Sequence, residues 1–130
     1  MELVAGLQGE MEMVVSARHL SSAVGNFGSD VLSTHEVVLL MELAAREAIQ
    51  GRLPKGMITV GTRVNIRHEA AALLGARVWA KARLLEVLGR RLRFYVEAYD
   101  RFGPLARGEN DHLIVSREAF LERVQRRKAP

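Results

Sequence analysis

The chain has 130 residues, with 19 lysines and arginines against 15 aspartates and glutamates, and it has no cysteine. This length predicts a single domain over residues 1–130 that has a real core but is small for an enzyme working alone, so oligomers are expected. The missing cysteine excludes disulfides, thiol nucleophiles and cysteine-ligated zinc. The formal net charge of +4 suits solubility, a phosphate-bearing ligand or nucleic acid.

The N-terminal segment has neither a basic region nor an apolar run of signal-peptide length. Elsewhere no apolar run approaches the length of a membrane span. We therefore expect a cytoplasmic protein with no membrane segment. A first strand is predicted over residues 9–17, where Met11, Met13 and Val15 recur at every second position. A glycine-rich polar loop, Ser21-Ser-Ala-Val-Gly-Asn-Phe-Gly-Ser29, follows it.

A long helix is predicted from Thr34 to Gln50, with Ser33 or Thr34 as its cap and Gly51 as its stop signal. Apolar residues surround it almost completely, and a helix of this kind is buried on more than one side. Glu42 falls at the border of the apolar arc, where a carboxylate is either half-buried or solvated. The wide apolar arc comprises Val37, Val38, Met41, Ala44, Ala45, Ala48 and Ile49, and Leu39, Leu40 and Leu43 lie opposite.

The strand predicted over residues 57–69 carries the most informative residue of the chain, His68. An unbroken alternation places His68 on the core-facing side, together with Ile58, Val60, Val64 and Ile66. A histidine facing the core must find a hydrogen-bond partner, and an imidazole, which titrates near neutral pH, is suited to moving protons. A core histidine with a purely structural hydrogen bond is the alternative.

Three further strands are predicted over residues 76–88, 91–102 and 105–115, joined by tight turns. A bulge is expected near Leu85, where the apolar side of the alternation switches. A short amphipathic helix follows over residues 116–126, with Ser116 as its cap. The order of elements predicts an α+β fold in which a sheet wraps around the long helix.

A long buried helix embraced by a curved antiparallel meander resembles the hot-dog fold. The spacing of Thr34, Glu42 and His68, with Gly61-Thr62 upstream of the histidine, resembles the fluoroacetyl-CoA thioesterase-like branch of hot-dog thioesterases. In that branch a threonine, a glutamate and a histidine form the catalytic set. The resemblance implies hydrolysis of an acyl-CoA thioester by Thr34, Glu42 and His68. It implies no metal and no cofactor, since coenzyme A is part of the substrate.

The branch carries an arginine on its last strand where this chain has His112, within Gly108-Glu-Asn-Asp-His112. Arginine is always charged and forked, whereas histidine is charged part of the time, so the family's substrate range transfers weakly. His112 shares one side of its strand with small residues, which suits the wall of a pocket, although a structural histidine is an equal alternative. We expect four substrate-binding residues: Phe27, Gly61, Asn110 and His112.

The chemistry needs a polarised carbonyl and an activated oxygen. The start of the long helix offers unpaired N–H groups for the carbonyl. We assign acid–base work to His68 and Glu42, and to Thr34 the binding of the acyl group or its attacking water, or the role of nucleophile. If Thr34 and Glu42 lie in one straight helix, about 12 Å of axial rise separates them. Either Thr34 lies in a loop that folds back, or the groups meet across a dimer interface. Hot-dog subunits pair along such seams, so a homodimer or dimer of dimers is expected.

Other functions remain open. Hot-dog acyl hydratases and dehydratases also use a carboxylate and a histidine, and a non-catalytic acyl-CoA sensor would need the pocket but not Glu42. Nucleic-acid binding is a third class, because aromatic and cationic residues interleave on the outer sheet face, although an outer face of this kind is usually only solvated. The basic residues near the pocket are candidates for the coenzyme A phosphates: Arg46, Arg52, Lys55, Arg63 and Arg67.

Overall fold

The computed structural model describes residues 2–128, and its elements follow the predicted order. Strand β1 (Gln8–Val14) precedes two short 3-10 helices, η1 (Ala17–His19) and η2 (Ser21–Val24), and the long helix α1 (Thr34–Ala48). The rest of the chain forms a meander and a second helix, which are β2 (Met57–His68), β3 (Arg77–Leu88), β4 (Arg91–Asp100), β5 (Gly103–Ser116) and α2 (Arg117–Arg126).

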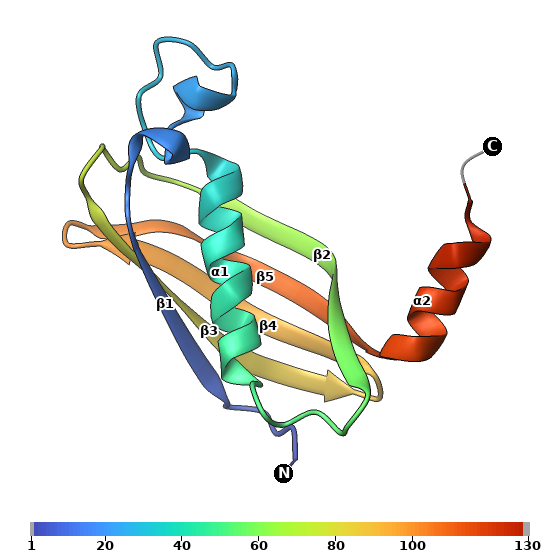
Figure 1. Ribbon diagram of the computed structural model, residues 1–130. Coiled ribbons are helices and arrows are strands. Elements are labelled where there is room, and N and C mark those ends of the chain that lie inside the picture. The colour runs from blue at the N-terminus through green and yellow to red at the C-terminus, as the bar shows by residue number, and fades with distance from the viewer. Residues whose placement is uncertain (1, 129–130) are drawn as a thin grey trace.

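The strands form one antiparallel sheet in the order β1-β3-β4-β5-β2, in which β1 and β2 are the edges. Figure 1 shows this sheet curving around α1, with α2 standing apart from it beyond the end of β5. The predicted α+β arrangement, a long central helix wrapped by a curved antiparallel sheet and followed by a short C-terminal helix, is confirmed. Within residues 2–128, no helix combines the length and the apolar character that crossing a membrane requires.

The core lies between α1 and the concave face of the sheet. Helix and sheet approach so closely at Gly9 of β1 that any side chain there would overlap the backbone of Ala44 and Ala48. Leu40 is buried but Leu39 is 47% exposed, so the second apolar side of α1 is only partly covered. The buried residues of α1 are Val37, Leu40, Met41, Ala44, Ala45 and Ala48.

A bulge interrupts β2 in its middle. Gly61 pairs with His112 and Arg63 pairs with Asp111, so two consecutive residues of β5 face three of β2 and Thr62 has no partner in the ladder. The Thr62 hydroxyl donates to the carbonyl oxygen of Asp111 at 3.3 Å. One extra residue reverses which side chains of the strand face the core.

The bulge corrects one expectation about β2. Residues paired across antiparallel strands point to the same face. His68 pairs with buried Ala106 and faces α1 as predicted. Ile58 and Val60 pair with Val115 and Leu113, on the other side of β5. The prediction that Ile58 and Val60 share the face of His68 was therefore wrong, because it assumed an unbroken alternation.

The bulge expected near Leu85 is confirmed. Leu84 pairs with Phe94 and Glu86 with Arg93, so Leu85 is the additional residue of β3. Ser116 caps α2 as predicted, since its hydroxyl accepts a hydrogen bond from the Ala119 N–H at 3.3 Å.

Candidate functional site

Thr34 and His68 come together although they are far apart in sequence. Thr34 is the first residue of α1, and His68 is the last residue of β2. The Thr34 Oγ1 lies 2.8 Å from the His68 Nδ1, and the pair lies on an exposed part of the molecule. The His68 Nε2 is buried and has no hydrogen-bond partner within residues 2–128. A hydroxyl in contact with an imidazole is the arrangement in which a base activates an oxygen nucleophile.

Glu42 occupies a separate position, about two turns further along α1. Its side chain is 24% exposed, as expected for a carboxylate at the border of the apolar arc. A β-carbon added to Gly61 would lie 2.7 Å from the Glu42 Oε1, so the carboxylate packs directly on this glycine of β2. Arg46, one turn later, holds the other carboxylate oxygen at 3.5 Å.

Within one chain, Glu42 does not reach the Thr34–His68 pair. About 12 Å of axial rise separates positions 34 and 42 of α1, and no hydrogen bond or ion pair joins Glu42 to either residue among those described. Of the two alternatives, a folded-back loop at Thr34 is excluded, because Thr34 is the first residue of α1 itself. One chain thus holds the three predicted catalytic residues in two separate groups, the Thr34–His68 half-site and the Glu42 half-site, one at each end of the 61–68 segment of β2.

His112 is completely buried beside the Glu42 half-site. Asn110 fixes its tautomer, because the Asn110 Nδ2 donates to the Arg63 carbonyl at 3.0 Å. The Asn110 Oδ1 must therefore accept the 2.6 Å hydrogen bond from the His112 Nε2. The His112 Nδ1 is left to accept from the Thr59 hydroxyl at 3.4 Å. Burial and, to a smaller extent, the charge of Arg46 lower the pKa of His112 to about 4, against the opposing charge of Asp111. His112 is therefore neutral at physiological pH.

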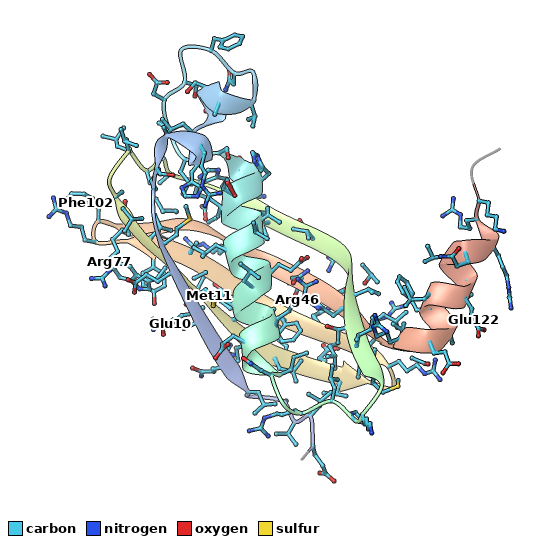
Figure 2. The ribbon with its side chains drawn as sticks, in the orientation of Figure 1. Glu10, Met11, Arg46, Arg77, Phe102 and Glu122 are labelled. Carbon is cyan, nitrogen blue, oxygen red and sulfur yellow. The ribbon has the colours of Figure 1, made fainter. Side chains whose placement is uncertain are left out.

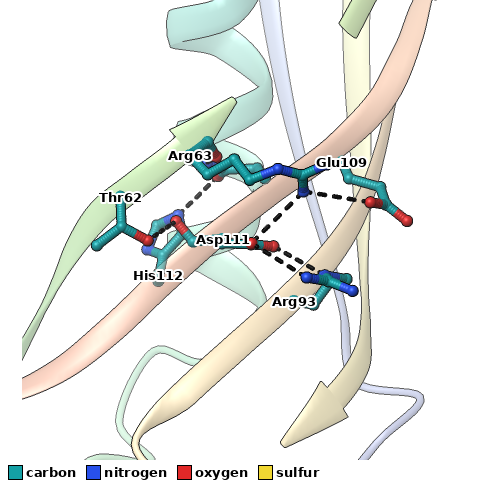
Figure 3. Close-up of polar contacts among 7 residues, drawn as sticks. Thr62, Arg63, Arg93, Glu109, Asp111 and His112 are labelled. Atoms are coloured by element: carbon teal, nitrogen blue, oxygen red, sulfur yellow. Dashed lines mark hydrogen bonds and ion pairs between the residues drawn. The ribbon is translucent and has the colours of Figure 1, made fainter. Parts of the chain in front are cut away.

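An ion-pair cluster lies on the opposite face of the same strands. Asp111 pairs in the ladder with Arg63 on one side and with Arg93 on the other, so both guanidinium groups converge on its carboxylate (Figure 3). The Arg93 Nε donates to it at 3.1 Å, and the Arg63 Nη1 lies at 3.4 Å from it and at 3.3 Å from Glu109. Burial opposes the ionisation of Asp111, but the hydrogen bonds and charges of Arg93 and Arg63 outweigh burial and lower its pKa.

Sequence analysis missed this cluster and the Thr59–His112 contact. Both depend on the pairing register of neighbouring strands, and the register is not visible in the pattern of any single strand. The cluster also bears on Arg63, one of the basic residues considered for coenzyme A phosphates. Its guanidinium is engaged by Glu109 and Asp111.

Phe27 projects from the segment between η2 and α1. It is 87% exposed and lines neither the cleft that contains Leu43 and Arg46 nor the one that contains His68. Ser33 takes the N-cap position of α1, but its side chain makes no capping hydrogen bond. The Ser33 Oγ is buried without a partner in the described part of the chain.

The cleft beside Glu42 has a volume of about 530 Å³ and lies between the C-terminal half of α1, β1 and the start of β2. Met11 and Arg46, which both line it, are labelled in Figure 2. A smaller open cleft of about 260 Å³ adjoins His68. A further cleft, of about 650 Å³ and lined in part by Trp79 and Phe102, contains none of the predicted catalytic residues.

The outer-face residues considered for nucleic-acid binding contact one another. Trp79 and Tyr99 pack edge to face with their ring centroids 4.9 Å apart, and the Lys81 Nζ lies 5.6 Å from the Tyr99 ring. The Arg77 Nε donates to Glu12 at 2.7 Å. These side chains already have partners within the chain. This arrangement is typical of an ordinary solvated sheet face and not of an open platform on which bases stack.

Comparison with known proteins identifies the family. The family described as fluoroacetyl-CoA-specific thioesterase matches residues 11–118. The fluoroacetyl-CoA thioesterase of Streptantibioticus cattleyicolor is 32% identical over 117 residues, which cover 88% of this chain and 84% of the relative.

Solved structures agree with the sequence match. A structure of fluoroacetyl-CoA thioesterase superposes with a TM-score of 0.91 at 26% identity, covering 99% of this chain and 100% of that chain. A Thermus thermophilus member of the thioesterase superfamily has a TM-score of 0.86 at 32% identity, with 95% and 94% covered. A hot-dog-like protein from Thermanaerovibrio acidaminovorans has a TM-score of 0.89 at 27% identity, with 97% and 93% covered. The chain therefore belongs to the fluoroacetyl-CoA-specific thioesterase family and is an acyl-CoA thioesterase with a hot-dog fold.

Proposed function

We propose that this acyl-CoA thioesterase works as a homodimer, in which Thr34 and His68 of one subunit share an active site with Glu42 of the partner subunit. The observation that carries the proposal is the position of the two half-sites on one edge strand. The Glu42 carboxylate packs against Gly61, and Thr34 is hydrogen-bonded to His68. Gly61 and His68 lie seven residues apart on β2. In an extended strand this is about 23 Å, too far for one chain to close.

Antiparallel pairing of β2 with its own copy closes that distance. If the two-fold axis places Asn65 opposite its own copy, the extra residue Thr62 brings Gly61 of one strand opposite His68 of the other, with both on the face of α1. The edge of β2 supports this arrangement, because edge strands present unpaired backbone groups that pair readily with another strand. Residues 61–65 form the most exposed run of β2, and Val64 is an apolar side chain 44% exposed within it.

The same rotation carries the loop before α1 toward the far end of the partner's helix. We assign Phe27, exposed in the single chain, to covering the partner's cleft. Gly61 contributes by giving Glu42 room, and Asn110 and His112 contribute a neutral wall. Lys55 and Arg67, exposed at the two ends of β2, are assigned to the phosphates of coenzyme A.

The geometry supports a two-step hydrolysis. The Thr34 hydroxyl attacks the thioester carbonyl while its proton passes to the His68 Nδ1, and the carbon–sulfur bond breaks. The coenzyme A thiolate leaves with the proton from His68, and the acyl group remains on Thr34 as an ester. A water molecule, deprotonated by Glu42 of the partner subunit, then attacks the ester carbonyl. The ester C–O bond breaks, the proton returns from Glu42 to the Thr34 oxygen, and the carboxylic acid is released. The positive end of α1 and its unpaired N–H groups stabilise the oxyanion in both steps.

Mixing two inactive variants tests the shared site. Glu42→Gln and His68→Ala homodimers should each have little activity. A heterodimer of the two contains one site with all three groups intact, so an equal mixture that exchanges subunits should regain about a quarter of the wild-type rate. If the site lay within one chain, the mixture would regain nothing. Matched mixing of Glu42→Gln with Thr34→Ala/His68→Ala should give the same recovery.

Rapid quenching tests the two chemical steps. Glu42→Gln should release about one thiol per site in a burst and then stall, and intact-mass spectrometry should find the acyl group on Thr34. Thr34→Ala should show neither a burst nor an acyl adduct. If Glu42→Gln releases no thiol and gains no mass, Thr34 is not the nucleophile.

A further inference from the structure

The cleft beside Glu42 is lined mainly by apolar side chains, although charged residues of α1 lie at its rim. Five apolar residues from four parts of the chain meet there. The polar lining residues are Arg46, Glu47 and Gln50, which are exposed at the C-terminal end of α1 or just after it, and the half-buried Thr59 of β2. The apolar lining residues are Met11, Leu43, Ile49, Leu53 and Ile58.

This cleft is continuous with the Glu42 half-site. Leu43 adjoins Glu42 in α1, and Thr59 precedes Gly61 by two positions on the same side of β2. The Glu42 carboxylate packs on Gly61 and is held by Arg46, which also lines the cleft. An acyl group that extends from a carbonyl bound near Glu42 can therefore reach the cleft past Leu43 and Arg46.

The wall behind Thr59 carries no charge. The His112 imidazole donates from Nε2 to Asn110 and accepts at Nδ1 from the Thr59 hydroxyl, so all its polar atoms are satisfied in the neutral form. A second proton, on Nδ1, would face the uncharged Thr59 oxygen and not a carboxylate, and it would place a positive charge near that of Arg46. The low pKa of His112, set by burial and Arg46, agrees with this geometry.

We propose that the enzyme selects acyl-CoA thioesters with an apolar acyl chain longer than acetyl, and that the chain lies in the cleft formed by Met11, Leu43, Ile49, Leu53 and Ile58. This inference rests on the proposed place of Glu42 in the active site. A volume of about 530 Å³ lies within the range of small-molecule sites. Each methylene buried there favours binding about fourfold, so the gain accumulates with chain length until the cleft is full.

The test is a series of saturated acyl-CoA substrates from acetyl to octanoyl, together with fluoroacetyl-CoA, assayed by thiol release. We expect kcat/KM for octanoyl-CoA to exceed the values for acetyl-CoA and fluoroacetyl-CoA at least tenfold. Leu43→Trp fills the cleft and should reduce the octanoyl-to-acetyl ratio at least tenfold. Met11→Trp fills it from β1 and should act in the same direction, which protects the test if one variant folds poorly. Leu121→Trp on α2 is the matched control and should leave the ratio unchanged.

The outcomes separate the inference from the proposed function. Hydrolysis that favours fluoroacetyl-CoA or acetyl-CoA over octanoyl-CoA would overturn the inference and leave the shared active site standing. The same holds if folded Leu43→Trp and Met11→Trp proteins keep the wild-type ratio. If the heterodimer mixture described above regains no activity while the chain-length preference holds, the assembly is wrong and the apolar subsite stands.

Discussion

The carboxylate of Glu42 extends into the space that a β-carbon at Gly61 would need. Its Oε1 lies 2.7 Å from that point, with Gly61 in an ordinary negative-φ region of the backbone. Glycine is therefore required here for space and not for backbone conformation. The contact ties one proposed catalytic group of α1 to the edge strand on which the other half-site also lies.

Gly61→Ala should displace the carboxylate without unfolding the protein, because the atom in the way is the end of a flexible side chain. We expect kcat to fall about tenfold or more and the melting temperature to change little, as for most changes at exposed positions. Gly108→Ala is the contrasting variant, because a β-carbon there would overlap the backbone of Asn65 and Ile66. It should lower the melting temperature clearly. Full activity in Gly61→Ala would show that Glu42 needs no fixed position.

His112 should make stability depend on pH. Its pKa is about 4 in the fold and 6.5 when unperturbed, so between these values the unfolded chain binds more protons than the folded one. The stability contribution is complete above 6.5 and is lost as the pH falls toward 4, to a limit of roughly 3 kcal/mol. Urea titrations at several pH values measure this slope. His112→Gln should flatten it and His35→Gln, at an exposed position, should not; an equal slope in all three proteins would rule out His112 as its source.

Arg93→Met should destabilise the sheet without affecting turnover. Asp111 has a side chain 4% exposed, and Arg93 supplies its shortest ionic hydrogen bonds. Leaving a buried carboxylate with Arg63 alone should cost about 3 kcal/mol, typical of breaking a buried pair. Arg91→Met, at an exposed position on the same strand, is the control. A free energy of unfolding within about 0.5 kcal/mol of wild type would mean that solvent replaces Arg93.

Ser33→Ala and Ser116→Ala should differ although both serines are N-caps. The Ser116 hydroxyl accepts a capping hydrogen bond, so its loss should cost about 1 kcal/mol. The Ser33 hydroxyl is buried without a partner, so its removal should be neutral or stabilising in thermal melts. A loss of about 1 kcal/mol for Ser33→Ala would indicate that this hydroxyl finds a partner in solution.

The fold was predictable wherever the apolar residues of a segment clearly marked one face of a helix or strand. Thr34 begins α1 as predicted, but the helix ends at Ala48 and not at Gln50. The last N–H groups turn to nearer carbonyls, with Ile49 bonding Arg46 and Gln50 bonding Glu47, and this tightening leaves no trace in the hydrophobic pattern. The bulge at Leu85 was predictable because the apolar side of the strand switches there.

The bulge at Thr62 was not predictable, because Ile58 and Val60 are apolar on one side of it and Val64 and Ile66 on the other. These four residues occupy even-numbered positions throughout, so the alternation continues unbroken in the sequence. The bulge nevertheless places Ile58 and Val60 on one face of the sheet and Val64 and Ile66 on the other. Thr34 and His68 are in contact, as expected for members of one catalytic set. The separation of Glu42 from both residues depended on where α1 begins. The Asp111 cluster required knowledge of which strands are neighbours.

The spacing along β2 also limits how this sequence can change in length. Between Gly61 and His68, one inserted or deleted residue would turn the imidazole to the outer face and away from Thr34. In the connection between His68 and Arg77, backbone hydrogen bonds to Leu105, Leu32 and Val15 hold residues 69–70, 72 and 75–76, so a change of length is expected near the exposed residues Leu73 and Leu74. Gaps in related sequences should therefore gather after the histidine and avoid the seven residues before it.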